Sequence, residues 1–303
     1  MRGYLANTDP DWFDFLAQRD DEEVNFWTPS ARPFSALAEG EPLLFRLKAP
    51  RNKVGGFGIF QRYTELPGWL AWQTFGPANG APSFDAMQAR LGEIRRRNAI
   101  GGPTVIGCRL LAGPVFLPEE AWVPLPSDWR PQIVSGKGYD LSHGEGATLW
   151  RRVLEATMAL RPALAAEGQP PRYGPAIPIR PRLGQAGFRV AVLDAYGRQC
   201  AVTTEHSLPV LEAAHIRPYA EGGNHQVSNG LLLRSDVHKL FDLGYVTVDP
   251  DHRFVVSQRL HNDYANGRTY YALHGQQLHL PPDPGQRPST DALRWHRDAR
   301  YLG

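Results

Sequence analysis

The sequence predicts a protein of the α+β class that is built from two domains joined by a proline-rich linker. Its 303 residues are enough for two domains of ordinary size, each with its own core. The hydrophobic content of 42% and the charged content of 21% are those of a globular chain rather than a disordered or fibrous one. We therefore expect a first domain over residues 1–143, a helix and linker over residues 144–185, and a second domain over residues 186–303.

Short apolar segments between glycines and prolines predict the strands of the first domain. They lie at residues 42–47, 55–60, 105–111 and 115–117. A helix is expected after Ser83, which can cap it, because apolar residues recur there at helical spacing. These residues are Phe84, Met87, Leu91 and Ile94. A second helix is expected from about Ala147 to Leu164, with an apolar stripe made of Leu149, Val153, Ala156, Leu160 and Leu164.

The linker is predicted between Glu167 and Gln185, which enclose a group of prolines. These are Pro170, Pro171, Pro175, Pro178 and Pro181. Proline at that density disfavours a helix and gives a semi-rigid, extended spacer, so we place the domain boundary here.

Several classes of protein are disfavoured by the sequence. The chain turns polar directly after Ala6, so we expect no secretory signal, and no stretch approaches the roughly 20 apolar residues that a membrane span needs. The two cysteines, Cys108 and Cys200, form no CxxC pair. That argues against a disulfide framework and a cysteine-built zinc site, and it suits a reducing cytoplasm. The net charge of +2 decides little, because a nucleic-acid ligand requires a local basic cluster rather than a high total.

In the second domain the same reasoning predicts a compact strand–loop–strand–helix unit. A helix at 188–196 precedes it, and the unit itself comprises strands at 210–216 and 231–233 and a helix at 236–243. His215 comes at the end of the first strand, shortly before Pro218, so its imidazole is expected beside an open loop. Asn229 precedes the second strand. Ser235 is expected to cap the following helix and Gly244 to end it.

Two residues of the predicted helix, His238 and Asp242, are four positions apart and therefore project from the same face. A neutral imidazole and a carboxylate on one helical face, opposite a lone histidine on a hairpin, are the groups that single-metal phosphodiester hydrolysis requires. The metal offsets the charge that develops on the phosphate and the leaving oxygen, while His215 removes a proton from the attacking water. Histidine suits that role because its unperturbed pKa lies close to the working pH.

The segment that carries these residues resembles the HNH nucleases, which have a ββα-metal fold. It shows the pattern AHIxP…GG…NGLLLxxDxHxLFDxG almost without gaps. The resemblance implies that His215 is the general base, that His238 is a metal ligand, and that Asp242 is a further ligand one helical turn on. Asn229 takes the central position of the motif, where it either orients the base histidine or contacts the metal.

One position departs from the family pattern. Many relatives carry an Asp or His ligand immediately before the base, and here that residue is Ala214. The third protein ligand is therefore open, with Asn229, Asp236 and Glu212 as candidates and water filling the rest of the shell. Ligands of these types suit Mg²⁺, Mn²⁺, Co²⁺, Ni²⁺ and Zn²⁺ alike, so the identity of the divalent metal ion is open as well.

The remaining histidines are expected to play no part in the chemistry. His225 lies in the loop between the two strands, where it could approach a phosphate, but the favoured interpretation is a solvated loop. The others are expected at the surface or in packing: His206, His252, His261, His274, His279 and His296. Cys200 stands where zinc-ribbon relatives have a CxxC pair, so we expect packing rather than zinc to hold the hairpin.

Roughly residues 1–135 resemble the PUA-like superfamily, especially its EVE branch, which is a small β-barrel. The resemblance rests on the segments 3–10, 24–30, 40–45 and 55–60. Several members hold a flipped, modified base in an aromatic-lined pocket. This implies a base-binding pocket made of Phe26, Trp27, Trp69, Trp72 and Phe75, with Asn25, Asn79 or Asp9 bonding to the edge of the base. The alternative is that aromatic residues of so small a barrel, Trp72 and Phe75 above all, belong to its core.

A PUA-like reader joined to an HNH unit resembles modification-dependent restriction endonucleases. We therefore expect a metal-dependent endonuclease that acts on double-stranded DNA with a modified base, such as a modified cytosine, and that binds no membrane. Cutting both strands with one active site per chain favours a homodimer. Two alternatives stay open: a DNA-binding protein whose HNH unit is degenerate, which Ala214 supports, and a homing or repair nuclease without modified-base specificity.

Overall fold

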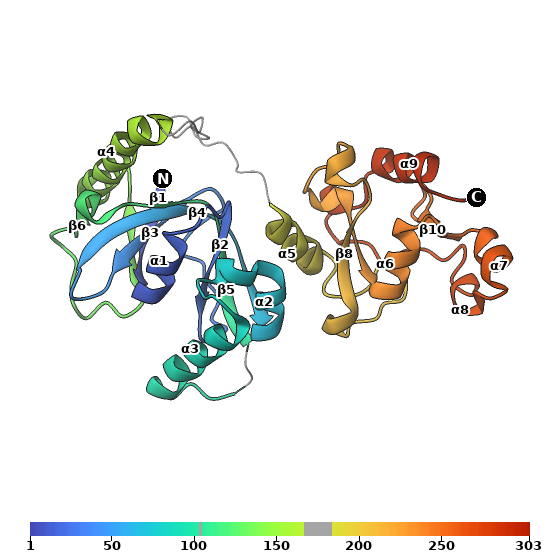
Figure 1. Ribbon diagram of the computed structural model, residues 1–303, viewed down its shortest axis with the longest axis horizontal. Coiled ribbons are helices and arrows are strands. Elements are labelled where there is room, and N and C mark those ends of the chain that lie inside the picture. The colour runs from blue at the N-terminus through green and yellow to red at the C-terminus, as the bar shows by residue number, and fades with distance from the viewer. Residues whose placement is uncertain (103–104, 167–183) are drawn as a thin grey trace. The chain divides into compact units, whose positions relative to one another are not determined.

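The computed structural model describes residues 1–102, 105–166 and 184–303 (Figure 1). The chain forms two compact units, which we call unit 1, residues 1–181, and unit 2, residues 182–303. The linker expected between Glu167 and Gln185 lies outside the described residues except for its last two positions. None of the helices in the described ranges combines the length and the apolar character that crossing a membrane requires.

A seven-stranded mixed sheet forms the centre of unit 1. Its strands are β1 (Arg2–Thr8), β2 (Glu23–Thr28), β3 (Pro42–Leu47), β4 (Lys53–Pro67), β5 (Val105–Phe116), β6 (Val123–Pro124) and β7 (Gly136–Asp140). They are ordered β2-β5-β4-β3-β1-β7, and β6 pairs with β4. β1 and β3 are parallel, with Leu5 opposite Leu44, and the other neighbouring strands are antiparallel. The segments expected at 105–111 and 115–117 fall in one continuous strand, β5, which ends at Phe116.

The α+β class is confirmed, since the described residues combine this sheet with helices. The described strand pairings run from β2 to β7, and none of them joins these two end strands to each other. What the described residues establish is therefore a sheet-rich α+β unit, without the closing pair of a barrel.

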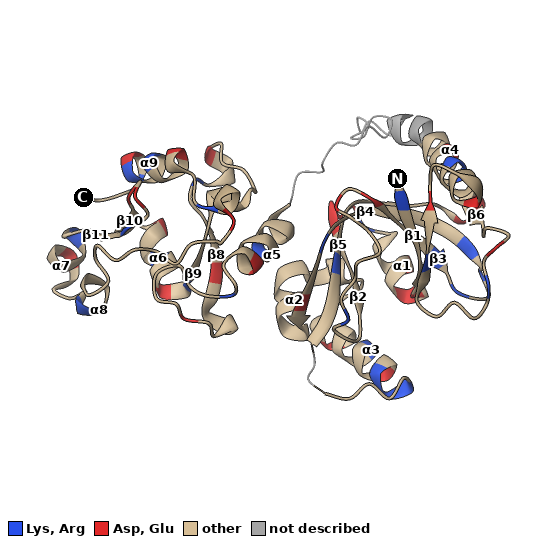
Figure 2. Cartoon of the chain, turned by 180° about the vertical axis from the view of Figure 1, so that it is seen from behind, with Lys and Arg blue, Asp and Glu red and all other residues tan. Residues whose placement is uncertain are grey.

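The described helices of unit 1 are α1 (Pro10–Leu16), α2 (Gly68–Phe75), α3 (Phe84–Arg97) and α4 (Gly144–Ala166). The periodicity of the sequence predicted α3 and α4, but it did not predict α1 and α2. Ser83 caps α3 as predicted, because its hydroxyl accepts the Ala86 N–H at 3.2 Å. The last turn of α3 carries Arg95, Arg96 and Arg97, which give the end of this helix the blue colour seen in Figure 2.

Adjacent residues of β3 explain how the sheet of unit 1 buries both of its faces. Successive side chains of a strand point to opposite faces. Phe45 packs with Trp12 and Phe13 of α1 in one core cluster, whereas Leu44 packs with Trp150 of α4 in the other. Phe45 and Leu44 are fully buried, and each such side chain contributes about 2–3 kcal/mol to folding.

Unit 2 is built from short elements around two β-hairpins. The helices are α5 (Gln185–Ala195), α6 (Ser235–Asp242), α7 (Arg259–Tyr264), α8 (Arg268–Tyr271) and α9 (Thr290–Ala299). The strands are β8 (Leu211–His215), β9 (Gly230–Arg234), β10 (Val246–Val248) and β11 (Phe254–Val256). β8 pairs with β9 and β10 with β11, both antiparallel. The expected strand–loop–strand–helix unit is thus β8, β9 and α6.

The expected cap of α6 is wrong by one residue. Arg234 occupies the N-cap position, and Ser235 is the first residue of the helix and makes no capping hydrogen bond. Arg234 instead binds the first-turn carboxylate of Asp236 at 2.6 and 2.8 Å, which ties the end of β9 to the start of α6. The segment after residue 245 packs on this unit as expected, since His296 of α9 stacks on Phe241 of α6 with ring centroids 3.7 Å apart.

Candidate active site

His215 lies at the end of the β8–β9 hairpin where the connecting loop begins. The register of the pair sets His215 opposite Gly230. Helix α5 packs against both strands, and a Cβ atom at position 230 would lie 2.5 Å from Val192 and 3.0 Å from Phe188. A glycine at this position therefore allows Phe188 to reach His215, on which its ring stacks with a centroid separation of 3.8 Å.

Helix α6 carries His238 and Asp242 on one face, as predicted. Nε2 of His238 lies 3.4 Å from Oδ2 of Asp242, while Nδ1 of His238 lies 2.6 Å from Oε2 of Glu212 in β8. A carboxylate only accepts hydrogen bonds, so Nδ1 donates to Glu212. In the neutral imidazole the lone pair is then on Nε2, beside Asp242. This is the carboxylate–histidine arrangement that orients histidines which bind metal ions.

The three candidates for a third ligand have different environments. Asp236 is occupied by Arg234 and also accepts the Tyr270 hydroxyl at 3.1 Å. The hydrogen bond from Arg234 holds the pKa of Asp236 below its usual value. Asn229 is occupied by backbone groups. Of the three candidates, Glu212 is the one in contact with His238.

The buried amide of Asn229 closes the loop between the two strands. Its Oδ1 accepts the Arg217 N–H at 3.0 Å, and its Nδ2 donates to the carbonyl oxygens of Arg217 and Asn224, both at 2.9 Å. The loop is tight, because a Cβ atom on Gly223 would lie 1.9 Å from the Arg217 carbonyl oxygen. Asn229 therefore fixes the backbone on both sides of the loop, including the residue directly before His225.

The expectation of a solvated position for His225 does not fit its environment, which is half-buried and in contact with His215. Nδ1 of His225 lies 3.0 Å from Nε2 of His215, and the ring of Tyr219 stacks on His225 at 4.7 Å. Burial, with smaller effects from the charges of His225 and His238, lowers the pKa of His215 to about 4. Burial also lowers the pKa of His225. Sequence spacing offered no signal for this contact beyond a histidine in the loop.

The donor groups in this region fit a divalent cation. The part of the chain that the structure describes contains no group of three or more His, Cys, Asp or Glu side chains that could hold a metal ion. The described residues do supply a pair of donor atoms, because Nε2 of His238 and Oδ2 of Asp242 are 3.4 Å apart. Two ligand bonds of about 2.1 Å that meet at a metal ion at a tetrahedral angle place their donor atoms about 3.4 Å apart. An imidazole with a carboxylate suits cations from Mg²⁺ to Zn²⁺, with water or substrate oxygens completing the shell.

In unit 1, a groove with a volume of 1370 Å³ runs past α1, β2 and α3. Phe26 and Trp27 line it, but the three aromatic residues predicted from the α2 segment do not: Trp69, Trp72 and Phe75. Asn25 is fully buried, and its Nδ2 donates to Oδ1 of Asn79 at 2.9 Å. Of the residues predicted to bind a base, the structure thus brings Phe26, Trp27 and Asp9 to the groove.

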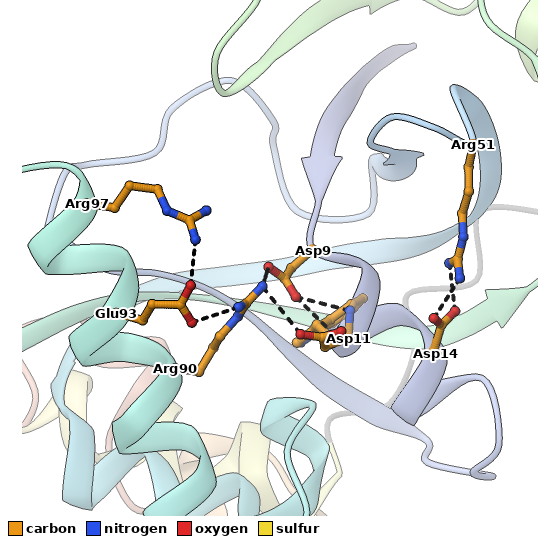
Figure 3. Close-up of polar contacts among 8 residues, drawn as sticks. Asp9, Asp11, Asp14, Arg51, Arg90, Glu93 and Arg97 are labelled. Atoms are coloured by element: carbon orange, nitrogen blue, oxygen red, sulfur yellow. Dashed lines mark hydrogen bonds and ion pairs between the residues drawn. The ribbon is translucent and has the colours of Figure 1, made fainter.

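The groove is lined by six cationic and three acidic side chains. They are Arg32, Lys48, Arg90, Arg96, Arg97 and Arg109, and Asp9, Asp11 and Glu93. The acids are paired with arginines of α3, where Arg90 binds Asp9 at 2.5 Å and Glu93 at 3.1 Å, and Arg97 binds Glu93 at 2.5 Å (Figure 3). Arg109 stacks over Phe34 at 4.2 Å, and burial lowers its pKa. The remaining positive charge favours an anionic ligand such as a phosphate.

Sequence spacing could not reveal this cationic groove. Its lining comes from segments between Asn7 and Ser135 that only the fold of the sheet brings together. Arg90 and Arg109 were therefore missed as candidate site residues.

Residues 200–249 match the family model described as HNH endonuclease. This range contains β8, β9 and α6, with His215, Asn229, His238 and Asp242. The chain thus contains an HNH endonuclease domain, and the prediction of an endonuclease of the HNH type is confirmed. HNH nucleases generally use a divalent metal ion.

Similar solved structures include an ASCH protein from Zymomonas mobilis, which is 14% identical in sequence. The alignment covers 49% of this chain and 94% of the ASCH chain, with a TM-score of 0.34. A second is the modification dependent TagI restriction endonuclease, which is 16% identical in sequence. The alignment covers 86% of this chain and 61% of the TagI chain, with a TM-score of 0.28. These TM-scores are too low to assign a fold or a function. No curated protein matches the chain.

Proposed function

We propose that this chain is a divalent-metal-dependent DNA endonuclease that acts on double-stranded DNA with a modified base. Residues 1–143 would recognise the DNA, residues 144–185 would connect the domains, and residues 186–303 would cut. One observation carries the proposal. Within the HNH domain, His238 is oriented by Glu212 at 2.6 Å, and its other nitrogen lies 3.4 Å from the carboxylate of Asp242.

His238 and Asp242 would hold the cation. When bound, the cation supplies positive charge that offsets the charge developing on the phosphate and the leaving oxygen. Glu212 would keep the lone pair of His238 on Nε2 by accepting the proton of Nδ1. Asn229, whose amide is engaged with the backbone on both sides of the loop, would act by holding that loop rather than as a ligand.

His215 would act as the general base. Burial lowers its pKa to about 4, so the imidazole is neutral near pH 7 and can accept a proton. A negatively charged DNA phosphate beside it would raise this pKa towards the working pH. As the imidazole takes a proton from water, the water oxygen bonds to phosphorus, the bond from phosphorus to the leaving oxygen breaks, and the leaving oxygen takes a proton from solvent.

The cationic groove of unit 1 would hold the DNA that is read. Arg32, Lys48, Arg96 and Arg109 line the groove and have no carboxylate partner in the described part of the chain. They can meet phosphates, while Trp27 offers aromatic surface to a base and Phe26, which is 7% exposed, packs in the core beneath it. Extruding a base costs a few kcal/mol, and stacking returns about 1–3 kcal/mol per base, so an aromatic pocket makes base reading energetically feasible.

The nuclease proposal is tested with supercoiled plasmid and the full chain in Mg²⁺, Mn²⁺, Co²⁺, Ni²⁺ or Zn²⁺. We expect nicked or linear plasmid with at least one cation and intact plasmid in EDTA. Asp242→Asn should lose most of the cleavage, whereas Asp298→Asn, at an exposed position on α9, should retain it. DNA retained on gels but cut with none of the cations, on any substrate, would support a DNA-binding protein with a degenerate HNH unit.

Base reading is tested by comparing unmodified plasmid with 5-methylcytosine, 5-hydroxymethylcytosine and glucosylated phage DNA. We expect one modified substrate to be preferred, and Trp27→Ala to weaken its binding about tenfold or more through lost stacking. Trp72→Ala is the matched control, since Trp72 lies in α2 outside the groove lining. Equal cleavage of every substrate would instead favour a homing or repair nuclease.

A further inference from the structure

The contact between His215 and His225 requires that one of the two rings donates a proton. Their facing nitrogens, Nε2 of His215 and Nδ1 of His225, are 3.0 Å apart, and the rings meet at an interplanar angle of 66°. A neutral imidazole has one N–H and one lone pair. Burial lowers the pKa of both rings, so both are neutral near pH 7, and the pair holds one donor and one acceptor at this contact.

The surroundings fix both rings in place. His215 is stacked on Phe188 of α5 with an interplanar angle of 15°, and His225 is stacked on Tyr219 with an angle of 5°. The backbone before His225 is held by the Asn229 side chain, which donates to the Asn224 carbonyl oxygen at 2.9 Å. The contact between the two imidazoles is therefore a built feature of the loop rather than a chance approach of two mobile side chains.

The direction of this hydrogen bond decides whether His215 can act as a base. If Nδ1 of His225 donates, Nε2 of His215 accepts, and the proton of the neutral His215 is on its own Nδ1. Both nitrogens of His215 are then unavailable. If Nε2 of His215 donates, its Nδ1 carries a free lone pair, and this atom has no hydrogen-bond partner among the described residues. Only this second arrangement is compatible with proton removal from water.

We propose that His225 is a positioning residue that accepts the Nε2–H of His215 and so holds the ring in the tautomer that can act as a base. The catalytic role of His225 rests on the proposed nuclease function. The hydrogen bond itself does not depend on that function. His225 would not touch the substrate, and it would act through His215, as a carboxylate or backbone carbonyl group does where it fixes the tautomer of a histidine.

The tautomer is measured by ¹⁵N NMR of histidine-labelled full chain without metal or DNA. The signals of His215 are identified by their loss in His215→Gln. We expect wild-type His215 to carry its proton on Nε2. His225→Ala should give a mixture of tautomers, and His225→Asn should restore the Nε2–H form because its Oδ1 can accept in place of Nδ1. A proton on Nδ1 of His215 in the wild type would overturn the proposal, whether or not the protein cuts DNA.

Cleavage kinetics give the second readout. His225→Ala should lower kcat about 10- to 100-fold with little change in KM, and His225→Asn should recover most of the loss. A purely structural loop histidine would not be rescued by asparagine in both experiments. Full activity of His225→Ala would overturn the positioning role. If the wild type cuts no DNA while the Nε2–H tautomer is found, the nuclease proposal fails and the hydrogen bond stands.

Discussion

Lowering the pH from 7 to 4 should destabilise unit 2 through His296, which is 2% exposed. Its Nε2–H donates to the Phe241 carbonyl oxygen at 3.0 Å, and its Nδ1 accepts the Thr247 hydroxyl at 2.8 Å. The neutral ring is thus satisfied on both sides. Burial, assisted by the charge of Arg300 and opposed by the hydrogen bond to Phe241, lowers the pKa of His296 to about 4.

The size of the effect follows from the difference between the folded and unfolded pKa values. The folded pKa is depressed from 6.5 to about 4, so the unfolded chain takes up a proton first as the pH falls. The contribution of His296 to stability is fully present above pH 6.5 and is lost as the pH falls towards 4. A difference of about 2.5 pKa units corresponds to about 3 kcal/mol of unfolding free energy.

Hydrogen exchange of the backbone amides of β10 and α9, corrected for the intrinsic effect of pH, measures this loss within unit 2. His296→Gln is the matched variant, because an amide can donate to Phe241 but does not titrate. From pH 7 to pH 4 the wild type should lose about 3 kcal/mol more opening free energy than the variant. Parallel curves for the two proteins would refute the reasoning, since other titrating groups are common to both.

Two further predictions concern the β8–β9 hairpin and the proposed metal ligands. Glu212→Gln should weaken the binding of Mn²⁺ about 10- to 100-fold, because the amide no longer holds His238 as the carboxylate does. Binding is measured by calorimetry, and the control variant Asp298→Asn should bind Mn²⁺ as the wild type does. Equal affinity of Glu212→Gln and the wild type would contradict the orienting role of Glu212. Gly230→Ala should cost about 1–3 kcal/mol in hydrogen exchange of unit 2, because its Cβ atom would meet Val192 at 2.5 Å. Gly285→Ala, whose nearest contact would be 3.4 Å, should change little, and equal stability of both variants would contradict the packing argument.

The sequence predicted the local elements of the site because each has its own pattern. The apolar period after Ser83 marked α3, and the motif from His215 to Asp242 marked β8, β9 and α6. The side chains of His238 and Asp242 share a face simply because they are one helical turn apart. Such features depend on residues that are close together in the sequence, so they can be recognised in a single sequence.

The contacts that depend on tertiary structure could not be predicted. His225 contacts His215 because Asn229 binds the loop backbone on both sides. The spacing of these residues in the sequence does not indicate this loop conformation. Asp236 and Glu212 were both candidate ligands, although Asp236 could also be explained as a first-turn acid favoured by the helix dipole. The contacts with Arg234 and His238 now distinguish them. The aromatic residues of α2 likewise matched a pocket by type, although the fold places them outside the groove lining.

The central claim is that the imidazole at position 215 performs the chemistry. The most direct measurement is single-turnover DNA cleavage, in the most active divalent cation, by wild type, His215→Ala and His206→Ala, the last at an exposed histidine of unit 2. We expect His215→Ala to bind DNA normally but to cut it about 10²- to 10⁴-fold more slowly, and His206→Ala to match the wild type. Cleavage by His215→Ala at the wild-type rate would contradict the account.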